Sequence, residues 1–236
     1  MGYRAFTACD SKYFRDHAPA YIQSCIETET PFTIVVVDAE SGSTDAIHDL
    51  IAQKTKGLGR ATVLEKVAEA PINDRVYYAC ARFIHAAMLM HEDMYTVESL
   101  LITDIDCIFM KHLPQPKLPV GLFVRNSLPG TVGWEAEGTK VAAGLVYIES
   151  SSVGRNFIRN VAAQITRLPK QWFIDQVALS RVAKTLTEFH TFTQTDMDWE
   201  FESDSYIWTG KGNRKYNSLT YVAKKRELEE RFKCAF

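Results

Sequence analysis

The chain has 236 residues, 46% of them hydrophobic and 24% charged, with a formal net charge of −2. This composition is typical of a globular domain with a sizeable core, and the small net charge argues against bulk attraction to nucleic acid or an anionic membrane. No apolar run is long enough to span a bilayer and no Cys-x-x-Cys pair occurs, so we expect a single cytoplasmic domain over residues 1–236 with no transmembrane segment.

Apolar strands and helical repeats alternate along the first half of the chain, which predicts an α/β fold with a mainly parallel sheet and flanking helices. A turn at 41–43 offers Ser43 or Thr44 as a helix N-cap. The expected strands cover 3–9, 32–37 and 61–64, and the expected helices cover 13–27, 45–54 and 74–91.

The second half is more mixed. Between two expected strands lies a Gly-rich loop over 126–140 that carries Trp134, Glu135 and Glu137. Charges alternate at helical spacing in the last segment, which favours a surface helix. The expected strands cover 120–125, 141–149, 188–192 and 205–208, and the expected helices cover 153–167, 172–184 and 223–233.

Two carboxylates, Asp104 and Asp106, stand between two apolar runs, and the first run, 100–102, is typical of a strand buried on both faces. Charges in such a place are costly unless they are paired or bind a metal. At a strand end both acids can reach one cation, and Mg²⁺ or Mn²⁺ in nucleotide sites takes one or two carboxylates plus phosphate oxygens. The pattern predicts a metal site for a diphosphate.

The same motif has a bland interpretation, because Asp-x-Asp alone occurs by chance in a chain of this length. The acids could instead cap the turn that follows the strand. A second copy, Asp196 and Asp198, has no apolar run before it and is expected in a solvated loop.

With these residues the chain resembles GT-A-fold glycosyltransferases, most closely the family 8 enzymes, from Phe6 to about Tyr216. The resemblance rests on Asp104-Ile105-Asp106, on the first strand and loop, on the helix around Arg82 and on three later segments. Those segments are Val141-Ala142-Ala143-Gly144-Leu145, Trp172 with Asp175-Gln176, and the loop Thr209-Gly210-Lys211-Gly212-Asn213-Arg214-Lys215.

The resemblance implies a metal-dependent transfer of sugar from a nucleotide-sugar donor, most simply a UDP-sugar, to an unknown acceptor. Residues 1–110 would bind the nucleotide and 111–236 the acceptor. It implies Mn²⁺ or Mg²⁺ on Asp104 and Asp106, and catalytic roles for Asp175 and Gln176. Donor contacts are implied for Phe6, Ala8, Asp10, Tyr13, Arg82, Asp104, Gly144, Gly212 and Lys215.

The chemistry of a diphosphate leaving group explains the last loop. Lys215 and Arg214 would add fixed positive charge where negative charge builds up. Gly210 and Gly212 would let backbone N–H groups approach the phosphates.

The chain departs from the family 8 pattern at two positions. Ala142 replaces an asparagine, and Thr209 replaces a metal-binding histidine. Separately, Val35-Val36-Val37-Asp38 followed by Gly42-Ser43-Thr44-Asp45 resembles family 2, whose enzymes invert the anomeric centre. Retaining chemistry is preferred here because of the matches at Asp175, Gln176 and Lys215.

Other interpretations remain open from the sequence. Arg82 could be a structural arginine paired with a core carboxylate, Asp10 could be a helix N-cap, and the histidines at 85, 91 and 112 are expected to pack or lie on the surface. The alternative functions are a nucleotidyltransferase and a non-catalytic nucleotide- or sugar-binding protein on the same fold.

Overall fold

Residues 2–39, 51, 55, 57–65, 75–91, 98–125 and 141–234 are described by a computed structural model. The chain forms two compact units. Unit 1 comprises Met1–Phe6, Ala70–Thr103 and Gln115–Thr193, and unit 2 comprises Thr7–Glu69, Asp104–Pro114 and Gln194–Phe236. Each unit takes segments from both halves of the chain, and strand β1 (Arg4–Asp10) contributes to both.

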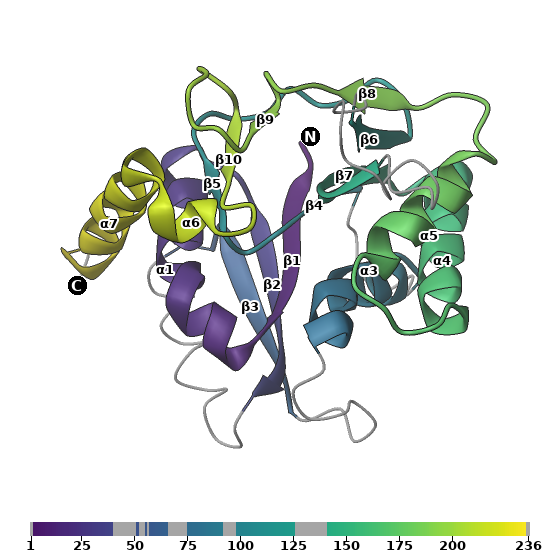
Figure 1. Cartoon of the computed structure of the whole chain (residues 1–236), viewed down its shortest axis with the longest axis horizontal. Helices are drawn as coiled ribbons and strands as arrows, with labels where there is room; N and C mark the ends of the chain where they lie inside the picture. The colour runs from purple at the N-terminus through teal and green to yellow at the C-terminus, as the bar shows by residue number, and fades with distance from the viewer. Residues whose placement is uncertain are drawn as a thin grey trace. The chain divides into compact units, whose positions relative to one another are not determined.

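Unit 1 is built on the strand order β1-β4-β7-β6-β8. β1 and β4 are parallel and pair Phe6 with Ile102, whereas β7 is antiparallel to both of its neighbours. Helix α4 packs against α3 and α5 (Figure 1). The elements are α3 (Arg75–His91), β4 (Ser99–Thr103), β6 (Val120–Val124), β7 (Val141–Glu149), α4 (Ser152–Arg167), α5 (Ile174–Ala183) and β8 (His190–Phe192).

Unit 2 combines the strand order β3-β2-β1 with a small sheet of order β5-β10-β9. β2 and β3 are parallel, β10 is antiparallel to β5, and β10 is parallel to β9. The elements are α1 (Ser11–Glu27), β2 (Phe32–Ala39), β3 (Gly59–Glu65), β5 (Cys107–Phe109), β9 (Met197–Asp198), β10 (Ile207–Thr209), α6 (Arg214–Asn217) and α7 (Leu219–Cys234).

The predicted α/β fold with a mainly parallel sheet and flanking helices is confirmed. Each strand and helix expected within the described residues is present, with ends displaced by a few residues. The turn at 41–43, most of the helix expected at 45–54 and the Gly-rich loop at 126–140 lie outside the described residues.

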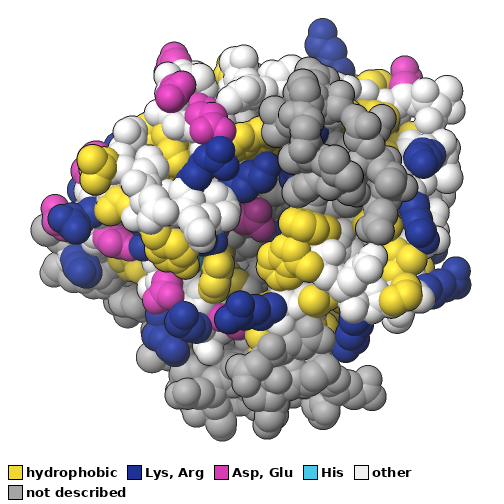
Figure 2. All heavy atoms as spheres, viewed as in Figure 1, with side chains coloured by type: hydrophobic (Ala, Val, Ile, Leu, Met, Phe, Trp, Pro, Cys, Tyr) yellow, Lys and Arg dark blue, Asp and Glu magenta, His cyan; other side chains and the backbone are white. Residues whose placement is uncertain are grey.

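Helix α7 is the surface helix expected near the end of the chain, but it is longer than expected and buries one face. It begins at Leu219, four residues before the expected start, and buries Tyr221, Leu228 and Phe232. The charged residues recur at helical spacing, which predicted the helix. The apolar residues are too widely spaced for the sequence to show which face is buried. Figure 2 shows Lys and Arg side chains interspersed with Asp and Glu side chains over this helix.

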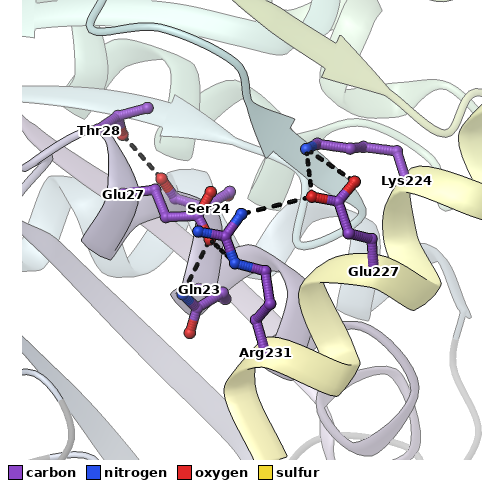
Figure 3. Close-up of polar contacts among 7 residues, drawn as sticks. All are labelled: Gln23, Ser24, Glu27, Thr28, Lys224, Glu227 and Arg231. Carbon is purple, nitrogen blue, oxygen red and sulfur yellow. Dashed lines mark hydrogen bonds and ion pairs between the residues drawn. The ribbon is translucent and has the colours of Figure 1, made fainter. Parts of the chain in front are cut away.

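A polar contact ties α7 to α1, which lies beside it (Figures 1 and 3). The Arg231 guanidinium lies between two carboxylates, with Nε 3.2 Å from Glu27 on α1 and Nη1 3.4 Å from Glu227 on its own helix. Lys224 also contacts Glu227, at 3.1 Å, and Gln23 donates to Glu27. This exposed network adds to the apolar contact between the two helices, which share a core cluster that includes Ala20, Tyr221 and Leu228.

No helix among the described residues is long and apolar enough to cross a membrane. The cytoplasmic location and the division of labour between residues 1–110 and 111–236 stay predictions.

Candidate functional site: a carboxylate–lysine cluster

The predicted acidic pair follows β4 directly, because the strand ends at Thr103 and β5 begins at Cys107. Asp104 is half-buried and Asp106 is 7% exposed. The Asp104 carbonyl accepts a hydrogen bond from the Cys107 N–H at 3.1 Å, which closes a tight turn between the two strands. The acids therefore belong to unit 2, where a turn fixes their backbone.

The Asp106 carboxylate binds Lys215, which lies 109 residues later in the chain. Lys215 Nζ is 2.7 Å from Asp106 Oδ2 and donates to the Tyr13 hydroxyl at 2.8 Å. Both charged side chains are buried, at 10% and 8% exposed. Burial alone would lower the pKa of Lys215, but the charge of Asp106 and the hydrogen bonds to Asp106 and Tyr13 outweigh it and raise the pKa. Lys215 is therefore a fixed cation.

The backbone of Asp106 is held from two further directions. The Tyr221 hydroxyl on α7 donates to the Asp106 carbonyl at 2.6 Å, and the Gly210 N–H donates to it at 3.2 Å. Gly210 has no room for a side chain, because a Cβ there would lie 2.7 Å from the Lys215 Cβ. No local sequence pattern indicates Tyr221, because its contact with Asp106 depends on where α7 packs.

The first strand and loop deliver Tyr13 to this cluster. Asp10 is the N-cap of α1 and accepts from the Tyr13 N–H at 2.7 Å, so its expected capping role is confirmed. Burial raises the pKa of the Tyr13 phenol, partly offset by the hydrogen bond from Lys215. Phe6 and Ala8 lie in β1 with buried side chains, at 1% and 5% exposed. A donor contact from Phe6 or Ala8, which stays a prediction, would therefore use the backbone.

The loop before α6 carries the remaining predicted residues of this unit. Gly212 has φ +60°, a left-handed conformation that favours glycine. Arg214 is engaged on the surface, with Nη2 2.9 Å from Glu200 Oε1, so in this structure it adds no charge at Asp106. Of the two expected cations, only Lys215 reaches the carboxylate.

A divalent metal fits this donor set only in part. Two neighbouring carboxylates suit Mg²⁺ or Mn²⁺ when phosphate oxygens and water complete the shell. Among the described residues no group of three His, Cys, Asp or Glu side chains could hold a metal. Thr209, at the position of the family's histidine, is buried in β10 and hydrogen-bonded to the Cys107 thiol. The residues fit a metal that is bound together with a diphosphate.

The second Asp-x-Asp motif has a structural role. The prediction that it lies in a solvated loop is wrong for Asp198. This side chain is fully buried in β9. Its oxygens accept from the N–H groups of Glu200, Glu202 and Ser203 at 2.8 to 3.0 Å, and from the Ser203 hydroxyl at 2.9 Å. Burial alone would raise the pKa of this carboxyl. The hydrogen bonds outweigh burial, so the pKa lies below its ordinary value. Asp198 organises the turn after β9.

Unit 1 holds a separate charged cluster. Arg82 on α3 is 6% exposed, and its Nη2 lies 3.2 Å from Asp175 Oδ2 and 3.3 Å from the Ala143 carbonyl of β7. Asp175 Oδ1 accepts from the Gln176 N–H at 2.8 Å. Arg82 therefore pairs with a core carboxylate and joins α3, α5 and β7, and its expected donor contact stays a prediction.

Gln176 differs from its neighbour Asp175. It is 8% exposed, and its Oε1 has no hydrogen-bond partner among the described residues, a costly state for a buried acceptor. Its helix begins after Phe173, which has φ 69°, a strained conformation for a phenylalanine. Gly144 is half-buried in β7, one residue after Ala143.

The three histidines at 85, 91 and 112 lie on the surface or pack against neighbouring residues, as expected. His91 and His112 are exposed, and His85 is half-buried on α3, where burial lowers its pKa.

No family model and no curated protein matches this sequence. Solved structures do match its fold. One is the glycosyltransferase GlyE of Streptococcus pneumoniae TIGR4, with a TM-score of 0.57 and 13% identity over 97% of this chain. Our chain spans 63% of the length of that GlyE chain.

Two further glycosyltransferases match more closely in shape. LgtC, a galactosyltransferase solved with donor and acceptor sugar analogues, has a TM-score of 0.64 and 13% identity over 97% of this chain and 95% of its own. The bifunctional glycosyltransferase WbbM has a TM-score of 0.63 and 12% identity over 99% of this chain and 51% of its own. Our chain thus has the GT-A-like fold of these enzymes, and at such low identity the likeness concerns the fold alone.

Proposed function

We propose that the protein is a glycosyltransferase that uses a nucleotide-sugar donor, most simply a UDP-sugar. The observation that carries this proposal is the partly buried cluster of Asp106, Lys215 and Tyr13. It is built on the Asp-x-Asp motif that follows a buried strand. A carboxylate beside a permanent cation suits a ligand that brings both a metal and phosphates. The fold shared with three glycosyltransferases supports the same choice.

In this proposal Asp104 and Asp106 hold Mn²⁺ or Mg²⁺ together with the donor diphosphate. The metal would supply Lewis-acid neutralisation of the leaving group when bound. Lys215 would bind a phosphate oxygen, and Gly212 would leave its backbone accessible to the diphosphate. Asp10 would act by positioning Tyr13, because its carboxylate accepts a hydrogen bond from the Tyr13 N–H.

The proposed roles in unit 1 follow from which oxygens are already engaged. Both oxygens of Asp175 have partners, so Asp175 would position Arg82 and Gln176 rather than attack the sugar itself. Gln176 Oε1 is the acceptor left for a sugar hydroxyl. Retention of the anomeric configuration is part of the proposal, and the product anomer, read by proton NMR, tests it.

The first test replaces Asp106 by Asn. Calorimetry with UDP, GDP and CDP, each with Mn²⁺ and then with EDTA, should find one nucleotide that binds only with metal. In Asp106→Asn its Kd should rise at least about a hundredfold, because contacts to a charged group are worth about 1.5–3 kcal/mol each.

Asp196→Asn is the matched control, because it alters the other Asp-x-Asp motif and should bind like the wild type. Circular dichroism of each variant reports the fold. Equal, metal-independent binding by the wild type and Asp106→Asn would refute the proposed metal and donor site.

A second candidate is a non-catalytic nucleotide-binding protein on the same fold. Two observations favour it: Asp106 is already neutralised by Lys215, and Thr209 stands where family 8 enzymes have a metal-binding histidine. This candidate predicts nucleotide binding that EDTA does not change, and no donor turnover.

A further inference from the structure

We propose that Lys215 is a built-in counter-cation of Asp106 that competes with the divalent metal, and that the donor diphosphate relieves this competition by taking over the lysine. This inference rests on the proposed function, because it concerns the regulation of the same site. It predicts that Lys215 weakens binding of metal alone while it strengthens binding of the metal–nucleotide pair.

The competition follows from the contacts of Asp106. Lys215 Nζ is 2.7 Å from Oδ2, at the distance of a strong charge-assisted hydrogen bond. A divalent cation on the same carboxylate would stand a few ångströms from the ammonium, in a setting where both side chains are buried and little screened. Lys215 must therefore leave Asp106, or gain a compensating anion, before a metal can bind there.

Among the described residues, the Lys215 ammonium has few other hydrogen-bond partners nearby. Its second contact is the Tyr13 hydroxyl at 2.8 Å, a neutral acceptor. Burial makes an ammonium without an anionic partner costly. A phosphate oxygen supplies the missing anion, so nucleotide binding and release of Asp106 by Lys215 are coupled. The coupling is reciprocal, as linkage requires.

The groups around Lys215 lie on two helices that pack against each other. Tyr13 is on α1 and Tyr221 is on α7, and Arg231 of α7 contacts Glu27 of α1 (Figure 3). Lys215 itself is on the four-residue helix α6, which follows Gly212 in its left-handed conformation. Because the lysine ammonium is carried on a flexible four-carbon stem, it can exchange partners without repacking α1 against α7.

The decisive variant is Lys215→Met, which keeps the length of the apolar stem and removes the charge. Mn²⁺ binding to the intact chain is measured by the electron paramagnetic resonance signal of free Mn²⁺, first alone and then with UDP, GDP or CDP, whichever binds the wild type. Lys215→Met should bind Mn²⁺ alone at least about tenfold more tightly than the wild type, and should bind the nucleotide with Mn²⁺ at least about tenfold more weakly.

Two further variants separate competition from general effects. Arg214→Gln removes one positive charge from the same short helix and should leave Mn²⁺ affinity within about twofold, because surface charges are screened. Lys215→Gln removes the charge but keeps a polar side chain that can still hydrogen-bond to Asp106 and Tyr13, so it preserves the fold if Lys215→Met does not. It should tighten binding of Mn²⁺ alone by about threefold or more.

The outcomes discriminate. If Lys215→Met and Lys215→Gln bind Mn²⁺ alone no more tightly than the wild type, while nucleotide binding still needs Mn²⁺, the competition is wrong and the proposed function stands. If Lys215→Met is misfolded, the result for Lys215→Gln decides. If the wild type binds no nucleotide with Mn²⁺ and no variant binds Mn²⁺, both proposals fail.

Discussion

Single residues decide what the two Asp-x-Asp motifs do. Asp106 accepts one ammonium, whereas Asp198 accepts hydrogen bonds from three backbone N–H groups and one hydroxyl. The apolar run before Asp104 predicted correctly which motif follows a buried strand. The sequence did not predict the burial of Asp198, whose backbone donors lie two to five residues later in the turn after β9.

His17 gives a pH dependence at the same scale. This α1 residue is 4% exposed, packs against the Tyr13 ring at 5.0 Å, and has an Nδ1 with no hydrogen-bond partner among the described residues. Burial, and then the charges of Lys225 and Lys215, lower its pKa to about 4 from an ordinary 6.5. The folded protein therefore holds this imidazole neutral at pH 5, where the unfolded chain takes up a proton.

Unfolding should thus become easier as the pH falls from about 6.5 to about 4. Between pH 7 and pH 4.5, the wild type should lose about 2 kcal/mol more free energy of unfolding than His17→Gln. Urea titrations at both pH values measure this difference. His91→Gln, on an exposed face of α3, is the control and should follow the wild type. Parallel pH profiles for all three proteins would contradict a neutral, buried His17.

At the scale of elements, a buried ion pair holds α3 to α5. Arg82 and Asp175 are about equally buried and 3.2 Å apart, and Arg82 also reaches the Ala143 carbonyl of β7. Burial lowers the pKa of the nearby Arg125, and Asp175 opposes this shift, so Asp175 serves two cations. Removing one partner leaves an uncompensated buried charge, which is costlier than removing both.

We therefore expect Arg82→Met and Asp175→Leu each to lower the free energy of unfolding by about 3–5 kcal/mol. The double variant should be less destabilised than the sum of the two, by about 1–3 kcal/mol, because the residues are in contact. Urea unfolding of the four proteins gives this coupling. If the losses in free energy of unfolding are additive, Arg82 and Asp175 do not stabilise each other. A stable double variant without activity would separate the structural role of the pair from the proposed sugar-binding role.

The sequence predicted the elements better than it predicted their partners. Hydrophobic periodicity gave β1, α1, β4 and β7 within a few residues, because each is a long or strongly patterned segment. The three-residue strand β5 was missed, since so short a run has no period of its own. The resemblance named Tyr13 and Lys215, but only tertiary folding places the two in contact with each other.

At the scale of the whole molecule, the chain returns to each unit several times. Unit 2, like unit 1, consists of three segments. Its carboxylate cluster takes one residue from each segment: Tyr13, Asp106 and Lys215. Such long-range contacts carry no local sequence signal, which is why Tyr221 was not predicted. The fold shared with GlyE, LgtC and WbbM nevertheless agrees with the α/β pattern predicted from the sequence.

The most direct test of the proposed function is phosphorus NMR of the wild type with Mn²⁺, a panel of UDP-, GDP- and CDP-sugars, and mono- and disaccharide acceptors. We expect the nucleoside diphosphate to appear from one donor class, and to be absent with EDTA or with Asp106→Asn. No release from any donor by a protein that binds the nucleotide would contradict glycosyl transfer and favour the binding protein. Pyrophosphate formed from a nucleoside triphosphate and a sugar phosphate would favour a nucleotidyltransferase instead.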